Sequence, residues 1–297
     1  MNNPNNAMSL VILAAGRGSR FGGPKQFTDF GPNQWPLMLY NISHAFKAGI
    51  LHVVFITRPE HLAVLQEKVL AKLPSQMTYD VVYQDISNFP QECFVDSTRE
   101  KPLGTAHALW CAKSVVKSNM LVINADDYYG SEAFTLAAQQ LNSNGLVAFE
   151  LKNTLSMHGG VNRGQCKLEN NKLIDIEEIL DITQDNEHEC IGYTTDNTQV
   201  NLPLTQLVSM NCWFFTQDIW PALETVLTQT LTENAALDVE AHLPSAVALL
   251  LTQNNLVKVL TSHDAWFGVT YAADSEAVNL QLTELTQQGK FPALAEQ

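Results

Sequence analysis

The alternation of two kinds of segment in the first half of the chain constrains the fold most strongly. Short apolar runs rich in β-branched residues are typical of buried strands, and helical patterns separate them. The expected strands are residues 9–15, 52–57, 79–84, 120–124 and 146–151, and the expected helices are residues 36–47, 60–73, 105–117 and 132–141. This order predicts an α/β fold with three layers, α/β/α, around a mostly parallel mixed sheet.

The second half of the chain follows a different rhythm. Strand-like pieces run from residue 161 to 215, and a polar stretch at 181–201 predicts an excursion or flexible hairpin because it has little to bury. Helices are expected at 217–228 and 239–251, a strand at 256–260 and a last helix from Asp274. We expect a disordered tail at 1–8 and one domain at 9–297, with a first part at 9–150 and a smaller lobe at 151–297.

Charge and cysteine content narrow the class of protein. The 297 residues include 17 basic and 31 acidic residues, a net charge of −14, which argues against nucleic acid and anionic membranes as partners. No apolar stretch reaches the roughly 20 residues of a membrane helix, and the N-terminus lacks a secretory pattern. Five cysteines without a CxxC pair suit a reducing compartment, so we expect a cytoplasmic protein. The sequence leaves open whether the chain forms a homo-oligomer.

A glycine-rich loop, LAAGRGSRFGGPK, follows the first expected strand. Its glycines allow backbone N–H groups to approach one anion, and it concentrates three cationic side chains in a chain with few. A dinucleotide fingerprint fails because Phe21 stands at the third glycine position, and a P-loop fails because Pro24 replaces its lysine. The loop therefore favours a triphosphate ligand over an ordinary strand-to-helix turn with incidental basic residues.

The loop resembles the signature of the sugar-1-phosphate nucleotidyltransferases, L-A-[AG]-G-x-G-x-R-[FM] followed by P-K. This resemblance implies a nucleotide-diphospho-sugar transferase-like fold, in which residues 9–150 bind the nucleotide and residues 151–297 bind the acceptor. It implies that Arg20 contacts the NTP phosphates and that Lys25 neutralises charge at the α-phosphate, so both are expected to be catalytic. The loop residues expected to bind the nucleotide are Leu13, Ala14, Ala15, Gly16, Arg17, Gly18 and Ser19.

A second matching segment is KPLGTAHAL. Gly104 and Thr105 stand at an expected helix start, where free amides and a hydroxyl are available. In the family, this segment and a glutamine at the preceding strand end, here Gln84, bind the nucleobase. The chain departs from the family by about fifteen extra residues at 85–99. His107 is expected either to line this pocket or to lie on the helix surface.

The segment NADDYYG follows a strongly apolar strand. A carboxylate at a strand end, with phosphate oxygens and water, is the usual protein environment of Mg²⁺. The resemblance implies that Asp126 is the metal ligand and that Asp127 supports the nucleotide site. The family's second metal ligand falls at Thr270 here, whereas the nearby Asp264 does not align.

The resemblance also implies acceptor-binding residues in the later lobe. Arg163 in GVNRG is expected to bind the acceptor phosphate, or else to be a hairpin arginine. Glu178 in LIDIEE and Asn211 in VSMNCWFF match residues that contact the sugar, and their groups suit hydroxyl donors.

The implied reaction joins a nucleoside monophosphate from an NTP to a sugar 1-phosphate, with Mg²⁺, and releases pyrophosphate. One alternative is a cytidylyltransferase acting on an alditol phosphate or on phosphocholine. For choline, Trp213, Trp266 and Tyr271 could form an aromatic cage. Another alternative is a sensor that binds a nucleotide sugar without turnover.

Overall fold

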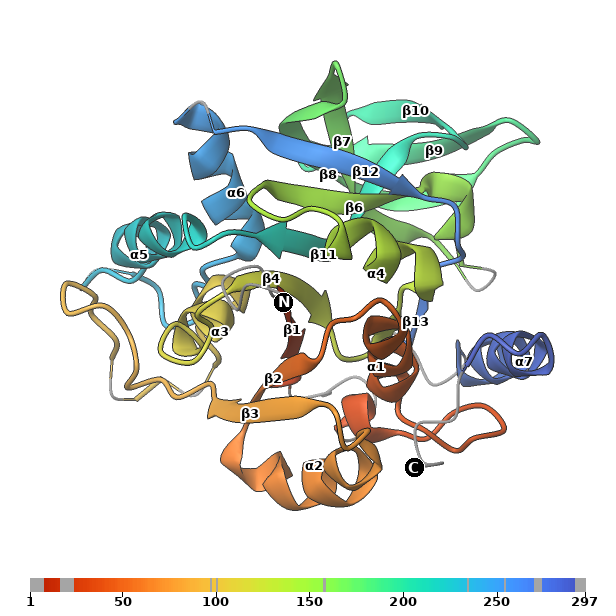
Figure 1. The fold of residues 1–297 in the computed structure, drawn as a ribbon. Helices are drawn as coiled ribbons and strands as arrows, with labels where there is room; N and C mark the ends of the chain where they lie inside the picture. Colours follow the sequence, from red (N-terminus) through yellow and green to blue (C-terminus); the bar gives the residue numbers. More distant parts are fainter. Residues whose placement is uncertain are drawn as a thin grey trace.

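The computed structural model describes residues 8–16, 24–96, 98–99, 101–156, 159–233, 235–253, 255–269 and 274–291. Helices and strands alternate over the first half (Figure 1). The elements there are β1 (Met8–Leu13), η2 (Lys25–Phe27), α1 (Leu37–Lys47), β2 (His52–Thr57), η3 (Pro59–His61), α2 (Leu62–Lys68), η4 (Leu70–Lys72), β3 (Thr78–Tyr83), α3 (Thr105–Cys111), β4 (Asn119–Asn124), β5 (Asp127–Tyr128), α4 (Gly130–Ala138) and β6 (Asn144–Glu150).

Strands dominate the second half up to residue 215, and α5, α6, β12, β13 and α7 then follow. The elements there are η5 (Leu151–Asn153), β7 (Val161–Glu169), β8 (Lys172–Gln184), β9 (Glu189–Thr194), β10 (Gln199–Pro203), β11 (Leu207–Phe215), α5 (Ile219–Thr230), α6 (Leu243–Thr252), β12 (Val257–Ser262), β13 (Phe267–Gly268) and α7 (Asp274–Gln287).

One mixed sheet runs through the molecule in the order β10-β9-β8-β12-β6-β11-β4-β1-β2-β3, with β7 paired to β11 and β8. Strands β3, β2, β1 and β4 are parallel, as expected for consecutive β-α-β units. β11 lies between β4 and β6 and is antiparallel to both. The pairs β7–β8, β8–β9 and β9–β10 are antiparallel as well. The predicted mixed α/β sheet is confirmed, and its parallel part carries the glycine-rich loop and the Asp–Asp segment.

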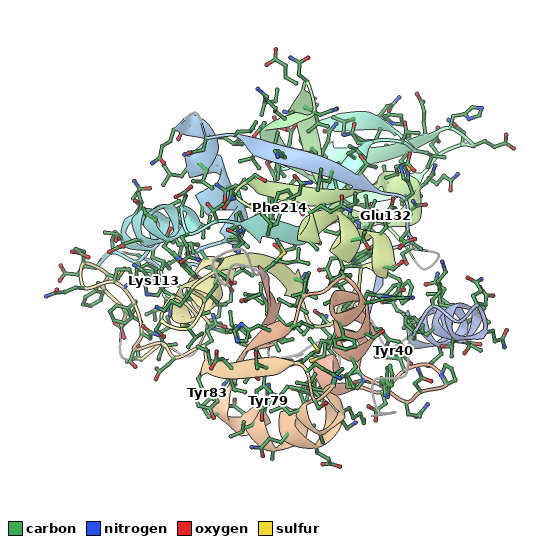
Figure 2. All side chains as sticks on the ribbon, in the orientation of Figure 1. Tyr40, Tyr79, Tyr83, Lys113, Glu132 and Phe214 are labelled. Atoms are coloured by element: carbon green, nitrogen blue, oxygen red, sulfur yellow. The ribbon has the colours of Figure 1, made fainter. Side chains whose placement is uncertain are left out.

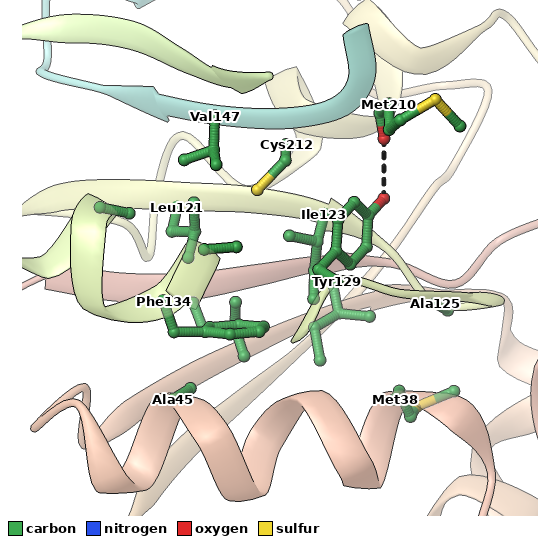
Figure 3. Close-up of a cluster of buried hydrophobic side chains, with 14 of the residues drawn as sticks. Met38, Ala45, Leu121, Ile123, Ala125, Tyr129, Phe134, Val147, Met210 and Cys212 are labelled. Carbon is green, nitrogen blue, oxygen red and sulfur yellow. Dashed lines mark hydrogen bonds between the residues drawn. The ribbon is translucent and has the colours of Figure 1, made fainter. Parts of the chain in front are cut away.

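Helices cover both faces of this sheet. α1, α2 and α4 pack on one face, whereas α3, α5 and α6 pack on the other. The two cores use alternate residues of the same strands: Ile12 faces the first core and Val11 faces the second, both without solvent exposure. Figure 3 shows part of the first core, where Met38 and Ala45 of α1 lie opposite Leu121 and Ile123 of β4.

The boundaries of α1 follow from its sequence. Pro36 stands at the N-cap position, where its missing N–H costs no helical hydrogen bond. At the other end, Gly49 adopts φ +83°, and its N–H donates to Phe46 O at 3.0 Å. A left-handed glycine after the last turn terminates the helix as predicted.

Three predicted helices differ from those observed. The helix expected at 60–73 is broken at Val69, whose backbone angles (φ −121°, ψ −61°) leave the helical region. The helix expected at 105–117 ends at Cys111, and turns complete the segment. The helix expected from residue 239 begins at Leu243, since Pro244 suits the first turn of a helix rather than its interior.

The polar stretch at 181–201 contains strand rather than a loose hairpin. β9, β10 and the end of β8 lie in it, and β1 begins at Met8, within the expected tail. Cys190 of β9 and its cross-strand partner Leu202 of β10 are buried against the first core. Asn186 makes the turn between β8 and β9, because its Oδ1 accepts from His188 N and Glu189 N. The polar residues of this stretch therefore form turns and outward-facing strand positions.

Helix α7, the last helix of the described residues, packs beside α1. Tyr40 lies between the two helices (Figure 2), and its hydroxyl donates to Phe30 O at 2.7 Å. Tyr79 and Tyr83 lie on β3, the edge strand at the end of the sheet opposite to β10 (Figure 2). Within the described residues, no helix has both the length and the apolar character needed to cross a membrane.

Candidate active site

The glycine-rich loop and the Asp–Asp segment meet at the C-terminal ends of β1 and β4. The two strands pair in parallel, with Leu13 opposite Asn124. The backbone N–H of Ala125 donates to Leu13 O at 3.2 Å, so the two chain segments leave the sheet side by side. Adjacent parallel strands that end at one edge of a sheet form the usual ligand-binding position of α/β folds.

A buried glutamine fixes the start of the glycine-rich loop. Gln26 Nε2 donates to Ala14 O at 3.1 Å and to Gly16 O at 3.0 Å, and only 4% of Gln26 is exposed. These bonds fix the orientation of the Ala14 and Gly16 carbonyl groups. Gln26 was missed by the sequence analysis, although its place directly after Pro24 and Lys25 was a signal. Arg17, Gly18, Ser19 and Arg20 lie outside the described residues.

Lys25 and Asp126 form an ion pair across this edge of the sheet. Lys25 Nζ also donates to Val269 O at 2.9 Å, and Val269 N donates to Asp126 O at 3.4 Å. The side chains of Lys25 and Asp126 are 26% and 23% exposed, so a ligand can reach both. A cation and a carboxylate, both partly exposed, thus face the same point next to the loop.

Asp127 is held more tightly than Asp126. Its Oδ2 accepts from Asn124 Nδ2 at 2.8 Å and from the Tyr129 hydroxyl at 3.2 Å. Burial and the neighbouring Asp126 carboxylate raise the pKa of Asp127 to about 7. A carboxylate already surrounded by donors positions its loop rather than binding a free ligand directly.

Asn41 of α1 secures the same segment from below. It is fully buried; its Nδ2 donates to Asp127 O at 2.6 Å and its Oδ1 accepts from Tyr129 N at 3.1 Å. The sequence analysis did not identify Asn41. The available signal was an amide on the apolar face of a predicted helix, where a polar group needs a partner.

The donor set around Asp126 fits one Mg²⁺ ion held largely by its substrate. Within the described ranges, no group of three His, Cys, Asp or Glu side chains converges. With phosphate oxygens and water as the other ligands, the partly exposed carboxylate of Asp126 could hold Mg²⁺ without such a group. Asp264 is not available, because its Oδ2 accepts from Glu132 N at 2.8 Å and so caps α4. Thr270 lies outside the described residues.

A cavity of about 440 Å³ adjoins the loop on the side of β3. Ala15 and Gln84 line it, and the extra segment at 85–99 contributes Asp85, Ile86 and Arg99. Arg99 is 6% exposed and donates to three backbone carbonyls, those of Lys101, Pro102 and Val239. The extra residues therefore form one wall of this cavity and order the KPLGT segment.

Gly104 and Thr105 act on backbone positions next to this cavity. Gly104 adopts φ +97°, and a Cβ there would meet Ala241 O at 2.3 Å, so only glycine fits. The Thr105 hydroxyl accepts from Leu243 N at 2.9 Å and fixes the start of α6. His107 is fully buried, so the prediction of a helix-surface histidine is wrong.

Arg163 and Glu178 lie together near the carboxylates. Glu178 is opposite Gly164 across β7 and β8, and the charges of Asp127 and Glu178 both act on Arg163. Burial lowers the pKa of Arg163 to about 10, which leaves it charged at neutral pH. Its guanidinium stacks on Trp266 at 4.9 Å and donates to Thr154, so its orientation is fixed.

Asn211 stands at an irregularity of β11 with φ +60°. Its Nδ2 donates to Asn124 Oδ1 at 2.7 Å, while its Oδ1 accepts from Trp213 Nε1 at 2.9 Å. The Tyr129 hydroxyl extends this network, since Met210 O lies 3.0 Å from it (Figure 3) and is the alternative acceptor to Asp127 for its single hydrogen. Asn211 thus links the later lobe to the Asp127 segment through Asn124.

The model of the nucleotidyl transferase family matches residues 9–178, more than half of the chain. The chain belongs to the nucleotidyl transferase family. The matched region includes the glycine-rich loop, both carboxylates and the 440 Å³ cavity.

Solved nucleotidyl transferase structures share the fold. The inositol-1-phosphate CTP transferase from T. maritima has a TM-score of 0.63 at 16% identity, covering 96% of this chain and 98% of its own. A putative glucose-1-phosphate thymidylyltransferase from Bacillus anthracis has a TM-score of 0.62 at 14% identity, covering 94% and 96%. UDP-glucose pyrophosphorylase from acinetobacter baumanii has a TM-score of 0.57 at 17% identity, covering 95% and 98%. No curated protein matches the sequence.

Proposed function

We propose that this nucleotidyl transferase moves a nucleoside monophosphate from an NTP to a sugar 1-phosphate, with Mg²⁺, and releases pyrophosphate and an NDP-sugar. The observation that carries the proposal is the Lys25–Asp126 pair beside residues 14–16 at the ends of β1 and β4. It combines a cation for phosphate oxygens with a carboxylate for a metal ion at one point. The family membership supports the class of reaction.

In the proposed site, the nucleotide phosphates lie against the loop amides that Gln26 orients. Lys25 exchanges its contact with Asp126 for the α-phosphate, and Arg20 adds a second cation. When bound, Mg²⁺ supplies further positive charge to the phosphate oxygens, and Asp126 is the residue that would hold it. The loss of its lysine partner leaves Asp126 free for that role.

The acceptor phosphate then attacks the α-phosphorus in line, and the bond to the pyrophosphate oxygen breaks. A phosphate monoester is already an anion, so the step requires no strong general base. Positioning and charge stabilisation provide the rate enhancement, as in other phosphoryl-type transfers. Lys25 remains at the α-phosphate while negative charge develops on the leaving group.

Acceptor recognition is assigned to the β7–β8 side of the site. Arg163 offers its charge to the acceptor phosphate, and Glu178 accepts from a sugar hydroxyl. Reduced solvation raises the pKa of Glu178, while Arg163 acts in the opposite direction. Asn211 has both amide atoms engaged within the protein, which supports a positioning role more than direct sugar contact.

A cytidylyltransferase for an alditol or cyclitol phosphate is the second candidate. Its support is the fold shared with a structure named as an inositol-1-phosphate CTP transferase, over 96% of this chain. Phosphocholine is less well supported as an acceptor. Trp213 is fully buried and stacks on Phe215, and the Arg163 guanidinium, itself a cation, covers one face of the Trp266 ring. Tyr271 lies outside the described residues.

Five free cysteines and the net charge of −14 support a cytoplasmic enzyme that has neither nucleic acid nor membrane as a partner. Whether it forms homo-oligomers is a matter for sedimentation analysis.

The test is pyrophosphate release with Mg²⁺ from each NTP and dTTP against sugar 1-phosphates, inositol 1-phosphate, alditol phosphates and phosphocholine. We expect one base and acceptor pair to react, and Asp126→Ala to abolish the reaction. Asp29→Ala is the matched control. Asp29 Oδ2 pairs with Lys68 Nζ at 2.7 Å, and this ion pair involves neither Asp126 nor Lys25. If no substrate pair turns over but calorimetry shows that a nucleotide sugar binds, the proposal is refuted, and the protein is the sensor that binds a nucleotide sugar without turnover.

A further inference from the structure

Four groups form a continuous hydrogen-bonded chain behind the 440 Å³ cavity. His107 Nε2 lies 2.9 Å from Asn88 O, and His107 Nδ1 lies 3.3 Å from Gln84 Nε2. Gln84 Nε2 also donates to Gly104 O at 3.1 Å. His107 is fully buried, whereas Gln84 lines the cavity. The chain therefore connects a buried imidazole to a side chain that a ligand can touch.

The two backbone carbonyls at the ends of this chain constrain its protons, while the Asp85 backbone also acts on His107 and Cys111 Sγ lies 3.6 Å from His107 Nε2. Asn88 O only accepts, so His107 Nε2 must carry a hydrogen. Burial lowers the pKa of His107 to about 4, hence the ring is neutral and Nδ1 has a free lone pair. Nδ1 accepts one hydrogen of Gln84 Nε2, and Gly104 O accepts the other. The Gln84 amide has no remaining donor.

We propose that His107 is a positioning residue that fixes the Gln84 amide, so that only its Oε1 faces the nucleobase. The inference rests on the proposed function and places the nucleobase of the NTP in the 440 Å³ cavity, which Ala15 and Gln84 line next to the glycine-rich loop. Among the described residues, no hydrogen-bond donor contacts Gln84 Oε1. Gln84 therefore selects a base edge that presents an N–H group and excludes an edge that presents only a lone pair.

The extra segment at 85–99 supplies the carbonyl that sets this arrangement. Asn88 N donates to Asp85 O at 2.9 Å and closes a turn, while the Asp85 carboxylate accepts from Ser87 N at 2.9 Å. This turn holds Asn88 O at hydrogen-bond distance from His107 Nε2. The segment that departs from the family pattern thus selects the tautomer of His107 and, through it, the orientation of Gln84.

Nitrogen NMR of the folded wild-type enzyme tests the tautomer directly. The chain has eight histidines, and the His107 signals are assigned by their loss in His107→Gln. At pH 7.5 we expect the neutral ring with hydrogen on Nε2. A ring protonated on Nδ1 would overturn the proposal, whether or not the enzyme turns over any substrate.

Substitution tests the consequence for base selection. In His107→Leu, the Gln84 amide loses one acceptor and can rotate, so its donor can also face the base. We expect the kcat/KM ratio between the best and second-best NTP to fall about tenfold, mainly through KM. In His107→Gln, the new amide can donate to Asn88 O and accept from Gln84, so the ratio should return to within about threefold of wild type.

His44→Leu is the matched control. His44 is also buried, at 2% exposure, but its ring contacts the Tyr128 hydroxyl at 2.9 Å, away from the cavity. The His44→Leu variant should lose about as much stability as His107→Leu, but its ranking of NTPs should not change. An unchanged ranking in His107→Leu, or an equal change in His44→Leu, would refute the positioning role. If the wild-type enzyme is inactive with every NTP, the proposed function fails, and NTP dissociation constants then provide the same ranking.

Discussion

Replacement of Lys25 by Met separates the contribution of Lys25 to catalysis from its contribution to the fold. Lys25 pairs with Asp126 and donates to Val269 O, and a quarter of its side chain is exposed. Met keeps the length and apolar stem of lysine but removes the charge. Because Lys25 is proposed to stabilise charge that develops during transfer, we expect kcat to fall by about 10²-fold or more, or about 3 kcal/mol in activation free energy.

The effect on stability should be much smaller. A partly exposed ion pair contributes about 1 kcal/mol or less to the free energy of unfolding. The melting temperature should therefore change by no more than about 2–4 °C. Steady-state pyrophosphate release and thermal unfolding of the same preparation provide the two measurements.

Lys68 provides a matched control for this experiment. It pairs with Asp29 at 2.7 Å and donates to Phe27 O at 3.1 Å, and 30% of its side chain is exposed. Lys68→Met therefore removes the same types of contact away from Asp126 and Asp127, and turnover should stay within about twofold of wild type. Turnover above half of wild type in Lys25→Met, or an equal loss in Lys68→Met, would refute the assignment.

Three further predictions concern the surroundings of the site. A Cβ on Gly268 would lie 2.3 Å from Asp127 Oδ1, so Gly268→Ala should displace this carboxylate and lower kcat by about tenfold or more. Circular dichroism should show that the variant remains folded, and an unchanged kcat would contradict the prediction. The raised pKa of Asp127, about 7, means that the folded state binds a proton more tightly than the unfolded chain between about pH 4 and pH 7. In metal-free buffer, wild type should therefore lose stability relative to Asp127→Asn as the pH rises from 5 to 7.5, whereas parallel melting curves would argue against it. Arg99→Ala removes the donor of three part-buried hydrogen bonds to backbone carbonyls, and chemical denaturation should show a loss of about 1–3 kcal/mol in the free energy of unfolding, together with a higher KM for NTP.

The sequence was most informative where local patterns decide the structure. β2 has the predicted bounds, and α1 differs by one residue, because β-branched runs and a terminating glycine are local signals. The sequence also predicted Asp126 at the end of a central strand, where the structure places it. The polar stretch that contains β9 and β10 was misinterpreted, because turn-forming Asn and Asp masked the alternation of its buried residues.

Contacts between distant segments were beyond the reach of the sequence. Val269 is 244 positions from Lys25, and no periodicity relates them. Asn41 and Gln26 are single amides whose partners are backbone atoms, so neither forms a recognisable motif. The roles of Arg20, Gln84, Arg163 and Glu178 remain predictions.

The place of β11 in the sheet has a consequence for biosynthesis. β11 separates β4 from β6, yet it follows both in the chain and begins only at Leu207. A ribosome adds about 5–20 residues per second, so β4 and β6 wait on the order of seconds for the strand that joins them. During that interval their apolar edges are unpaired and can associate with other chains. We therefore expect slower translation between β6 and β11 to lower the soluble yield, although the finished enzyme would be identical.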